Sequence, residues 1–305
     1  MRHGFITADV FTDRPFGGNQ LAVFPDATAI PGDLMLDIAR EFNYSETVFV
    51  LPPESPEHAR RLRIFTPGGE IPFAGHPTVG AAHVLAATGA IALTSAETRI
   101  IFEEGVGPVP VLIRSEGGRP VFAQLTAARL PELGPPPPTR ETLADLLSLE
   151  PRDMPGGTMS PQAVSVGLPF LFVPLRDRGA VGRARVRMER WEATLASYWA
   201  PMIMVFARDA EHPGSDIRAR MFAPGISVPE DPATGSACAA LGGYLAARDG
   251  KRDGTLRWVV EQGFEMGRPS ILEVEADKIA GATTAIRVGG STVVVSEGTM
   301  EIPRG

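Results

Sequence analysis

The chain has 305 residues, a net charge of −7 at pH 7 and 44% hydrophobic residues. This length predicts about two domains, and the composition is typical of a globular protein with enough chain to bury a core. The negative charge argues against a nucleic-acid partner. The single cysteine, Cys238, excludes an internal disulfide, a cysteine-rich metal site and any mechanism that needs two thiols.

The hydropathy pattern gives no sign of a membrane segment. Residues 1–10 break their apolar run at Asp9 and lack the apolar core of a signal peptide. No apolar run in the chain is long enough to cross a bilayer. We therefore expect a cytoplasmic protein without a membrane partner.

The first half is predicted to form many strands around a helix or two. A helix is expected over 33–42, because Leu34, Ile38 and Phe42 recur at helical spacing. A second helix is expected over 80–88, where Ala and Gly dominate and polar residues are almost absent, which is typical of a helix packed on every side. The predicted strands cover residues 5–11, 21–24, 46–51, 61–65, 99–103, 109–114 and 120–125.

A proline run at 135–138 is the strongest boundary signal in the chain, since consecutive prolines favour an extended spacer. We therefore expect an N-terminal half over 1–130 and a C-terminal half over 131–290. A last strand over 291–305 is a candidate to return to the first half.

The second half shows no regular alternation of strands and helices, so a Rossmann sheet is not expected, and neither a dinucleotide fingerprint nor a Walker loop is present. Helices are predicted over 139–149, 187–199 and 236–247. Strands are predicted over 164–175, 203–207, 217–222, 271–275, 285–288 and 292–295.

One stretch of the chain occurs twice. Residues 65–82 and 222–237 share a pattern of strand, turn, polar residue, proline and small-residue helix. The polar residue is His76 in the first copy and Asp231 in the second. A repeat of this kind predicts two similar halves whose special residues could face one another.

Each copy places a proline at the entrance of its helix, where the missing N–H costs nothing. The free N–H groups of such a helix start bind anions, and Gly75 and Gly235 leave the backbone open to close approach. Ser236 adds a hydroxyl donor. Two facing helix starts would bind a carboxylate or a developing enolate-like charge; alternatively, they are only proline-initiated helices with Asp231 as a cap.

Two side chains are candidates for proton transfer. His76 titrates near neutral pH in its ordinary state and lies in a Gly-flanked turn. Glu46 begins the apolar strand over 46–51, where partial desolvation would raise its pKa towards a useful acid/base range. The alternative for Glu46 is an exposed carboxylate at a strand edge.

These residues lie in segments that resemble the phenazine-biosynthesis PhzF-like family. The segments are spread over nearly the whole chain, and their order makes the resemblance specific. They comprise residues 18–23, 43–47, 65–67, 75–78, 231–237, 262–263 and 265–270.

The resemblance implies an α+β fold of the diaminopimelate-epimerase-like type. In this fold, two pseudo-symmetric halves each wrap a curved, mostly antiparallel sheet around a central helix, and the active site lies between them. It also implies an isomerase without cofactor or metal, usually a homodimer. Glu46 resembles the family's acid/base, and His76 and Asp231 resemble its polar partners.

The resemblance further implies a pocket for a small carboxylate substrate. Ser236, with the backbone around Gly75 and Gly235, resembles the carboxylate site. Asn19 resembles a pocket residue, although many relatives carry proline where Gln20 stands. Ser45, which precedes the acid/base, is a further candidate for substrate binding. The thiols that related racemases use are missing from both helix starts.

The sequence thus predicts a cofactor-independent isomerase of a small carboxylate metabolite, with trans-2,3-dihydro-3-hydroxyanthranilate as the reaction implied by the resemblance and phenazine biosynthesis as the implied process. Two alternatives stay open at this point. One is a thiol-free epimerase or racemase that uses Glu46 and His76. The other is a non-catalytic protein that binds a small ligand.

Overall fold

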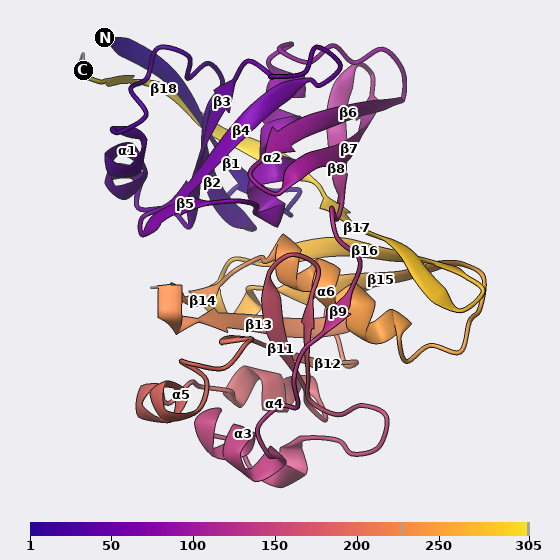
Figure 1. The fold of residues 1–305 in the computed structure, drawn as a ribbon. Helices are drawn as coiled ribbons and strands as arrows, with labels where there is room; N and C mark the ends of the chain where they lie inside the picture. The colour runs from indigo at the N-terminus through magenta and orange to yellow at the C-terminus, as the bar shows by residue number, and fades with distance from the viewer. Residues whose placement is uncertain (227, 304–305) are drawn as a thin grey trace. The chain divides into compact units, whose positions relative to one another are not determined.

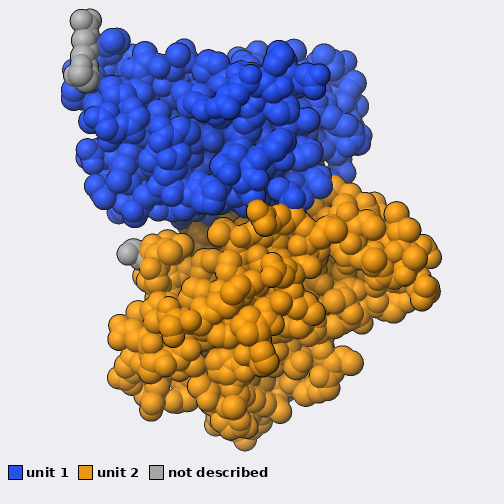
Figure 2. Space-filling model, in the orientation of Figure 1, with its two compact units in different colours: residues 1–128, 288–305 blue, residues 129–287 orange. Residues whose placement is uncertain are grey.

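The computed structural model describes residues 1–226 and 228–303; Ser227 of the second repeat copy and the last two residues of the predicted strand over 291–305 lie outside them. The chain divides into two compact units, coloured separately in Figure 2. Unit 1 comprises Met1–Ala128 and Val288–Gly305, and unit 2 comprises Arg129–Arg287. No helix among the described residues combines the length and apolarity that crossing a membrane requires.

Unit 1 is a curved sheet around one buried helix (Figure 1). Pairing runs from β18 through β1, β2, β3, β4, β6 and β7 to β8, and the pairs are antiparallel except β2–β3 and β4–β6. The short β5 forms a hairpin with β4. The strands are β1 (Arg2–Val10), β2 (Asn19–Phe24), β3 (Glu46–Leu51), β4 (Arg60–Thr66), β5 (Gly69–Ile71), β6 (Glu97–Glu104), β7 (Gly107–Glu116), β8 (Arg119–Thr126) and β18 (Thr292–Glu301).

Helix α2 (Gly75–Ala87) is the core of unit 1. It contacts β1, β2, β3, β7, β8 and β18, and each of its residues except Ala87 is buried. This confirms the helix predicted from the Ala/Gly-rich segment, although α2 begins five residues earlier, at Gly75. The second helix, α1 (Met35–Phe42), instead packs an amphipathic face on β3 and β4.

Gly80 lets α2 approach the sheet closely. A Cβ atom at this position would lie 2.5 Å from Cδ2 of Leu21 and 2.6 Å from Cγ2 of Val10, both fully buried. We expect Gly80→Val to lower the free energy of unfolding by about 1–3 kcal/mol, because an overpacked core forces strained rotamers. Urea denaturation checks this. Gly4→Ala, with open space around its Cβ position, is the control, and equal midpoints for both variants would contradict the packing account.

Unit 2 repeats the same pairing order. It runs from β9 through β10, β11, β12, β13 and β15 to β16, with β14 as a hairpin on β13, and β11–β12 and β13–β15 are the parallel pairs. The strands are β9 (Glu132–Leu133), β10 (Gln162–Ser165), β11 (Pro169–Pro174), β12 (Met202–Ala207), β13 (Ile217–Ala223), β14 (Val228–Asp231), β15 (Gly254–Gln262), β16 (Ser270–Ile279) and β17 (Ala282–Gly290), which contains the boundary between the units. Helix α6 (Gly235–Ala246) is the counterpart of α2 and is buried along its whole length.

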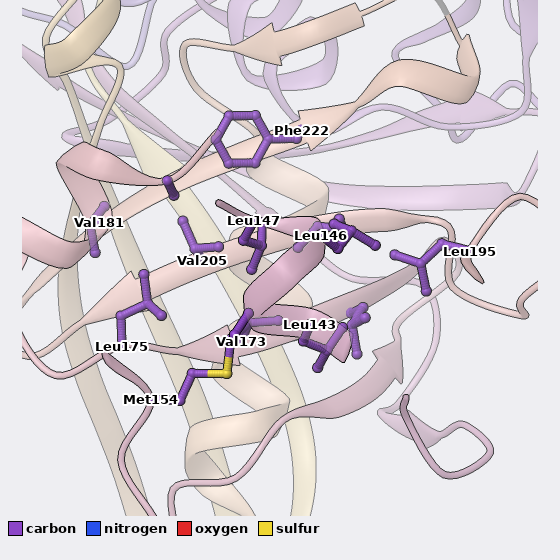
Figure 3. Packing of buried hydrophobic residues seen from close by; sticks show 14 of the residues in the cluster. Leu143, Leu146, Leu147, Met154, Val173, Leu175, Val181, Leu195, Val205 and Phe222 are labelled. Atoms are coloured by element: carbon purple, nitrogen blue, oxygen red, sulfur yellow. The ribbon is translucent and has the colours of Figure 1, made fainter. Parts of the chain in front are cut away.

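A second apolar cluster of unit 2 lies between its sheet and three short helices (Figure 3). The helices are α3 (Arg140–Leu146), α4 (Arg178–Arg183) and α5 (Met188–Thr194). The cluster is centred on Leu143, Val173, Leu195, Val205 and Phe222. Single 3₁₀ turns cover Pro151–Asp153, Pro224–Ile226 and Phe264–Met266.

The structure corrects several predicted elements. The strand expected over 164–175 is a hairpin of β10 and β11, reversed at Gly167, which has a φ of 130°. Strand β15 was not predicted, because the charged Glu261 interrupts its apolar pattern. Glu261 is fully buried, but it accepts from the guanidinium of Arg218 at 2.9 Å and from two backbone N–H groups. The helix expected over 187–199 ends at Thr194, and α4 was missed.

The repeat also extends to charged side chains of the two units. Arg63 forms a bidentate ion pair with Glu70 and lies over the ring of Phe65. Its counterpart Arg220 does the same with Glu230 and Phe222. Glu103 accepts from the backbone N–H groups of residues 54 and 55, as Glu261 does from those of residues 211 and 212. The two units therefore share internal contacts as well as topology.

Candidate active site

Three predicted residues of unit 1 lie at one end of the sheet. Asn19 begins β2 and Glu46 begins β3, and these strands are parallel neighbours with Leu21 opposite Glu46. Because parallel strands start at the same edge of a sheet, Asn19, Ser45 and Glu46 are brought together. Ser45 donates from Oγ to Oδ1 of Asn19 at 3.3 Å.

The start of α2 adds His76 to this group. Nδ2 of Asn19 lies 3.2 Å from Nδ1 of His76, and Nε2 of His76 lies 3.3 Å from Oε2 of Glu46. Gly75 is the first residue of the helix. The five residues predicted for the first half, Asn19, Ser45, Glu46, Gly75 and His76, therefore share one site within unit 1.

The hydrogen bonds define which nitrogen of His76 carries the proton. Oδ1 of Asn19 accepts from Ser45, so its Nδ2 is the group that donates to Nδ1 of His76. A neutral imidazole has one N–H, which this contact assigns to Nε2, the nitrogen 3.3 Å from Oε2 of Glu46. Asn19 and Ser45 thus orient the histidine towards the acid/base candidate.

Burial keeps His76 neutral. The residue is 3% exposed, and this desolvation lowers its pKa to about 3, although a hydrogen bond to the backbone of Gln20 acts in the opposite direction. The side chain of Glu46 is 17% exposed. Glu46 is therefore a partly buried carboxylate beside a neutral N–H donor, and the alternative of an exposed strand-edge residue is wrong.

Unit 2 presents the matching helix start. Asp231 ends β14, and the N-terminus of α6 follows at Gly235 and Ser236, with Asp231 and Ser236 6% and 7% exposed. Oγ1 of Thr234 donates to Oδ2 of Asp231 at 2.5 Å. Asp231 therefore interacts with the residue that precedes α6, as expected of a residue that orders the helix start.

Gln262 was missed as a site residue. Its Nε2 donates to the backbone carbonyl of Asp231 at 2.7 Å and to Oγ1 of Thr234 at 3.0 Å, and its Oε1 accepts from the Thr234 N–H at 3.2 Å. Because the side chain of Gln262 binds three groups of one turn, it fixes the start of α6. The available signal was its place before Gly263 in the family signature, but the strand that carries it was not predicted.

Cys238 lies inside α6 and is fully buried. Burial raises the pKa of its thiol, which keeps the sulfur protonated. Cys238 therefore packs as a small buried side chain of the helix.

Comparison with known proteins places the chain in a family. The model described as phenazine biosynthesis-like protein matches residues 8–298. An uncharacterized isomerase of Mesorhizobium japonicum is 38% identical over 301 residues, which are 98% of each chain. The trans-2,3-dihydro-3-hydroxyanthranilate isomerase of Pseudomonas aeruginosa is 32% identical over 299 residues, covering 97% of this chain and 98% of that enzyme.

A solved structure shares the fold over its whole length. The Bacillus anthracis phenazine biosynthesis protein of the PhzF family has a TM-score of 0.88 and 25% identity, covering 99% of this chain and 100% of that one. The α+β fold class predicted from the sequence is confirmed, and so is the resemblance. The chain belongs to the phenazine biosynthesis-like protein family, and it is an isomerase.

Proposed function

We propose that the protein isomerises a small carboxylate metabolite by general acid/base catalysis, with Glu46 as the proton carrier. The observation that supports this most is the contact between Glu46 and the neutral, buried His76 at 3.3 Å. As a base, Glu46 takes a proton from a substrate carbon, and as an acid it returns the proton to another position. The side chain of His76, with Nε2 3.3 Å from Oε2 of Glu46, stabilises the carboxylate form, which exists before the first step and again after the second.

The proposed substrate is trans-2,3-dihydro-3-hydroxyanthranilate or a close analogue. The Pseudomonas aeruginosa relative bears the name of that reaction at 32% identity. The decisive experiment incubates the protein with this compound and follows the formation of an isomer by NMR. Turnover of other cyclic carboxylates, with none of this compound, would redirect the proposal within the same chemistry.

The start of α6 is proposed to bind the substrate carboxylate. Helix α6 has twelve residues, and the free N–H groups at its N-terminus, beside the small residues Gly235 and Ser236, favour an anion. We expect Ser236→Ala to raise KM about tenfold while kcat changes much less, because a hydrogen bond to a charged group is lost in ground and transition state alike. Initial-rate kinetics check this. Ser165→Ala, at a buried serine of β10, is the control, and an unchanged KM for Ser236→Ala would contradict the assignment.

Epimerisation fits the geometry of unit 1 less well. An epimerase needs an acid and a base on opposite faces of one carbon, whereas Glu46 and His76 contact each other directly. Freedom from cofactors and metals and the homodimer stay predictions from the resemblance, and the cytoplasmic location stays a prediction from the hydropathy pattern.

A further inference from the structure

Glu104 is a buried carboxyl group that the proposed chemistry does not use. It ends β6 and is 8% exposed, and its Oε1 lies 2.6 Å from Oγ1 of Thr78 in the first turns of α2. Thr78 is two residues beyond His76 on that helix. The contact therefore links the strand end to the helix start that carries the active-site histidine.

The hydroxyl of Thr78 has only one proton to donate. Its Oγ1 also lies 2.7 Å from the backbone carbonyl oxygen of Ala74, which can only accept. When Thr78 donates its hydroxyl proton to Ala74, its contact with Glu104 is a hydrogen bond only if Glu104 is protonated and donates to Thr78. With a carboxylate at Glu104 the single hydroxyl proton serves only one of the two oxygens, whereas a neutral carboxylic acid satisfies both contacts.

The second unit holds an amide at the corresponding position. The parallel register places Arg61 opposite Glu103 in unit 1 and Arg218 opposite Glu261 in unit 2. The next residues along the strands are therefore Glu104 and Gln262. In unit 2 the hydroxyl of Thr234 donates to Asp231 and accepts from the neutral Gln262 amide. In both units the side chain at this strand position therefore contacts a threonine hydroxyl at the helix start.

The glycine that follows each residue supports this correspondence. A Cβ atom on Gly105 would lie 2.8 Å from Cα of Pro72, and one on Gly263 would lie 2.5 Å from the carbonyl oxygen of Pro232. In unit 1 the N–H of Val106 also donates to Pro72 at 3.0 Å. The end of β6 is therefore in close contact with the segment that leads into α2.

The charged side chains near Glu104 do not cancel the effect of burial on its pKa. The titratable side chains beside it on β4, β5, β6 and the loop before β4 are Arg61, Arg63, Glu70, Glu103 and Glu54, which line one depression with it. Arg63 pairs with Glu70 and Arg61 with Glu54.

On the helix side, His76 and His83 of α2 are buried, and burial lowers the pKa of His83 to about 4. Burial likewise raises the pKa of Glu104 to about 8, against the smaller opposing effect of Thr78. Both histidines are therefore neutral in the range where Glu104 ionises.

We propose that Glu104 is a positioning residue: as a neutral acid it holds the first turn of α2, and with it His76, against β6, and it releases this turn when it ionises at alkaline pH. The inference rests on the proposed role of His76 beside Glu46. The enzyme should therefore lose activity above neutral pH because Glu104 ionises, and this loss does not depend on Glu46.

The test compares Glu104→Gln with the wild type. Glutamine keeps a neutral donor for Thr78 and reproduces Gln262. We expect kcat at pH 7 within about twofold of the wild type, whereas at pH 9 the wild type falls about tenfold and the variant does not. An alkaline loss of equal size in both proteins would overturn the proposal. Thr78→Val, which removes the acceptor, should lower kcat at both pH values.

Two readouts do not depend on turnover. The infrared band of a protonated carboxyl group should be present at pH 7, disappear above about pH 8 and be missing in Glu104→Gln. Glu103→Gln is the control, because two backbone N–H groups lower the pKa of Glu103 to about 2 and this residue should contribute no such band.

The second readout is stability. Since the folded pKa of Glu104 is raised above its ordinary value of 4.5, the folded state binds the extra proton between these values. The stability of the wild type should therefore fall relative to Glu104→Gln from about pH 5 to about pH 8. If the proposed reaction is wrong but Glu104 is a positioning residue, these two results still hold. If neither the band nor the relative loss of stability is seen, the inference about Glu104 fails by itself.

Discussion

Glu46→Gln is expected to lower kcat by about 10²–10⁴-fold, the range that a positioned acid/base contributes. Glutamine has nearly the same shape and keeps an oxygen atom beside Nε2 of His76, but it cannot take a proton from carbon. Substrate binding should persist, because the proposed carboxylate site lies on α6 and not on β3. Kinetics together with calorimetric titration of the substrate separate the two effects.

Glu41→Gln is a matched control, since Glu41 is an exposed glutamate of α1 a few residues earlier in the chain. Its kcat should equal that of the wild type. Turnover by Glu46→Gln at the wild-type rate would remove Glu46 from the mechanism, whatever the identity of the substrate.

His76→Phe is the change with the second-largest expected effect. Phenylalanine fills most of the same buried space but removes the N–H that faces Glu46. Loss of a donor to a partly buried carboxylate costs about 1–3 kcal/mol, so kcat should fall by about 10–100-fold. The carboxylate form also becomes harder to maintain, so the acid limb of the rate profile should move to higher pH.

The pH profile of this variant distinguishes two roles. Because burial lowers the pKa of His76 to about 3, the histidine stays neutral at the pH of the assay and is not the group that titrates in the acid limb. The limb should therefore move in His76→Phe rather than vanish. His83→Phe replaces another buried histidine of α2 and should leave the limb in place. A limb that vanishes in His76→Phe would show that His76 itself is the titrating group.

Local patterns predicted much of the fold. The small-residue segments that form α2 and α6 were identified because a helix enclosed by a sheet needs small apolar residues on every side. The repeat indicated two similar units, and the structure extends it to ion pairs that do not follow from the sequence pattern, such as Arg63 with Glu70 and Arg220 with Glu230. Strand β15 was not predicted, because the charge of Glu261 is compensated only by partners that are distant in sequence.

The site was predicted as a set of residues but not as a geometry. Glu46 and His76 are separated by thirty positions, and their contact depends on the parallel register of β2 and β3 and on the packing of α2. Tertiary contacts of this kind leave no local periodicity. The same reason explains why Gln262 and Glu104 were not recognised: each matters through hydrogen bonds to a helix start that is distant in sequence.

The most direct test of the proposed mechanism is proton NMR in D₂O with a panel of cyclic and amino-acid carboxylates that includes trans-2,3-dihydro-3-hydroxyanthranilate. Our account predicts that one compound of the panel yields signals of an isomer, with deuterium at the carbon that receives the proton, and that Glu46→Gln yields none. A compound that binds tightly while every C–H signal of the panel stays unchanged, or the same conversion by Glu46→Gln, would contradict it.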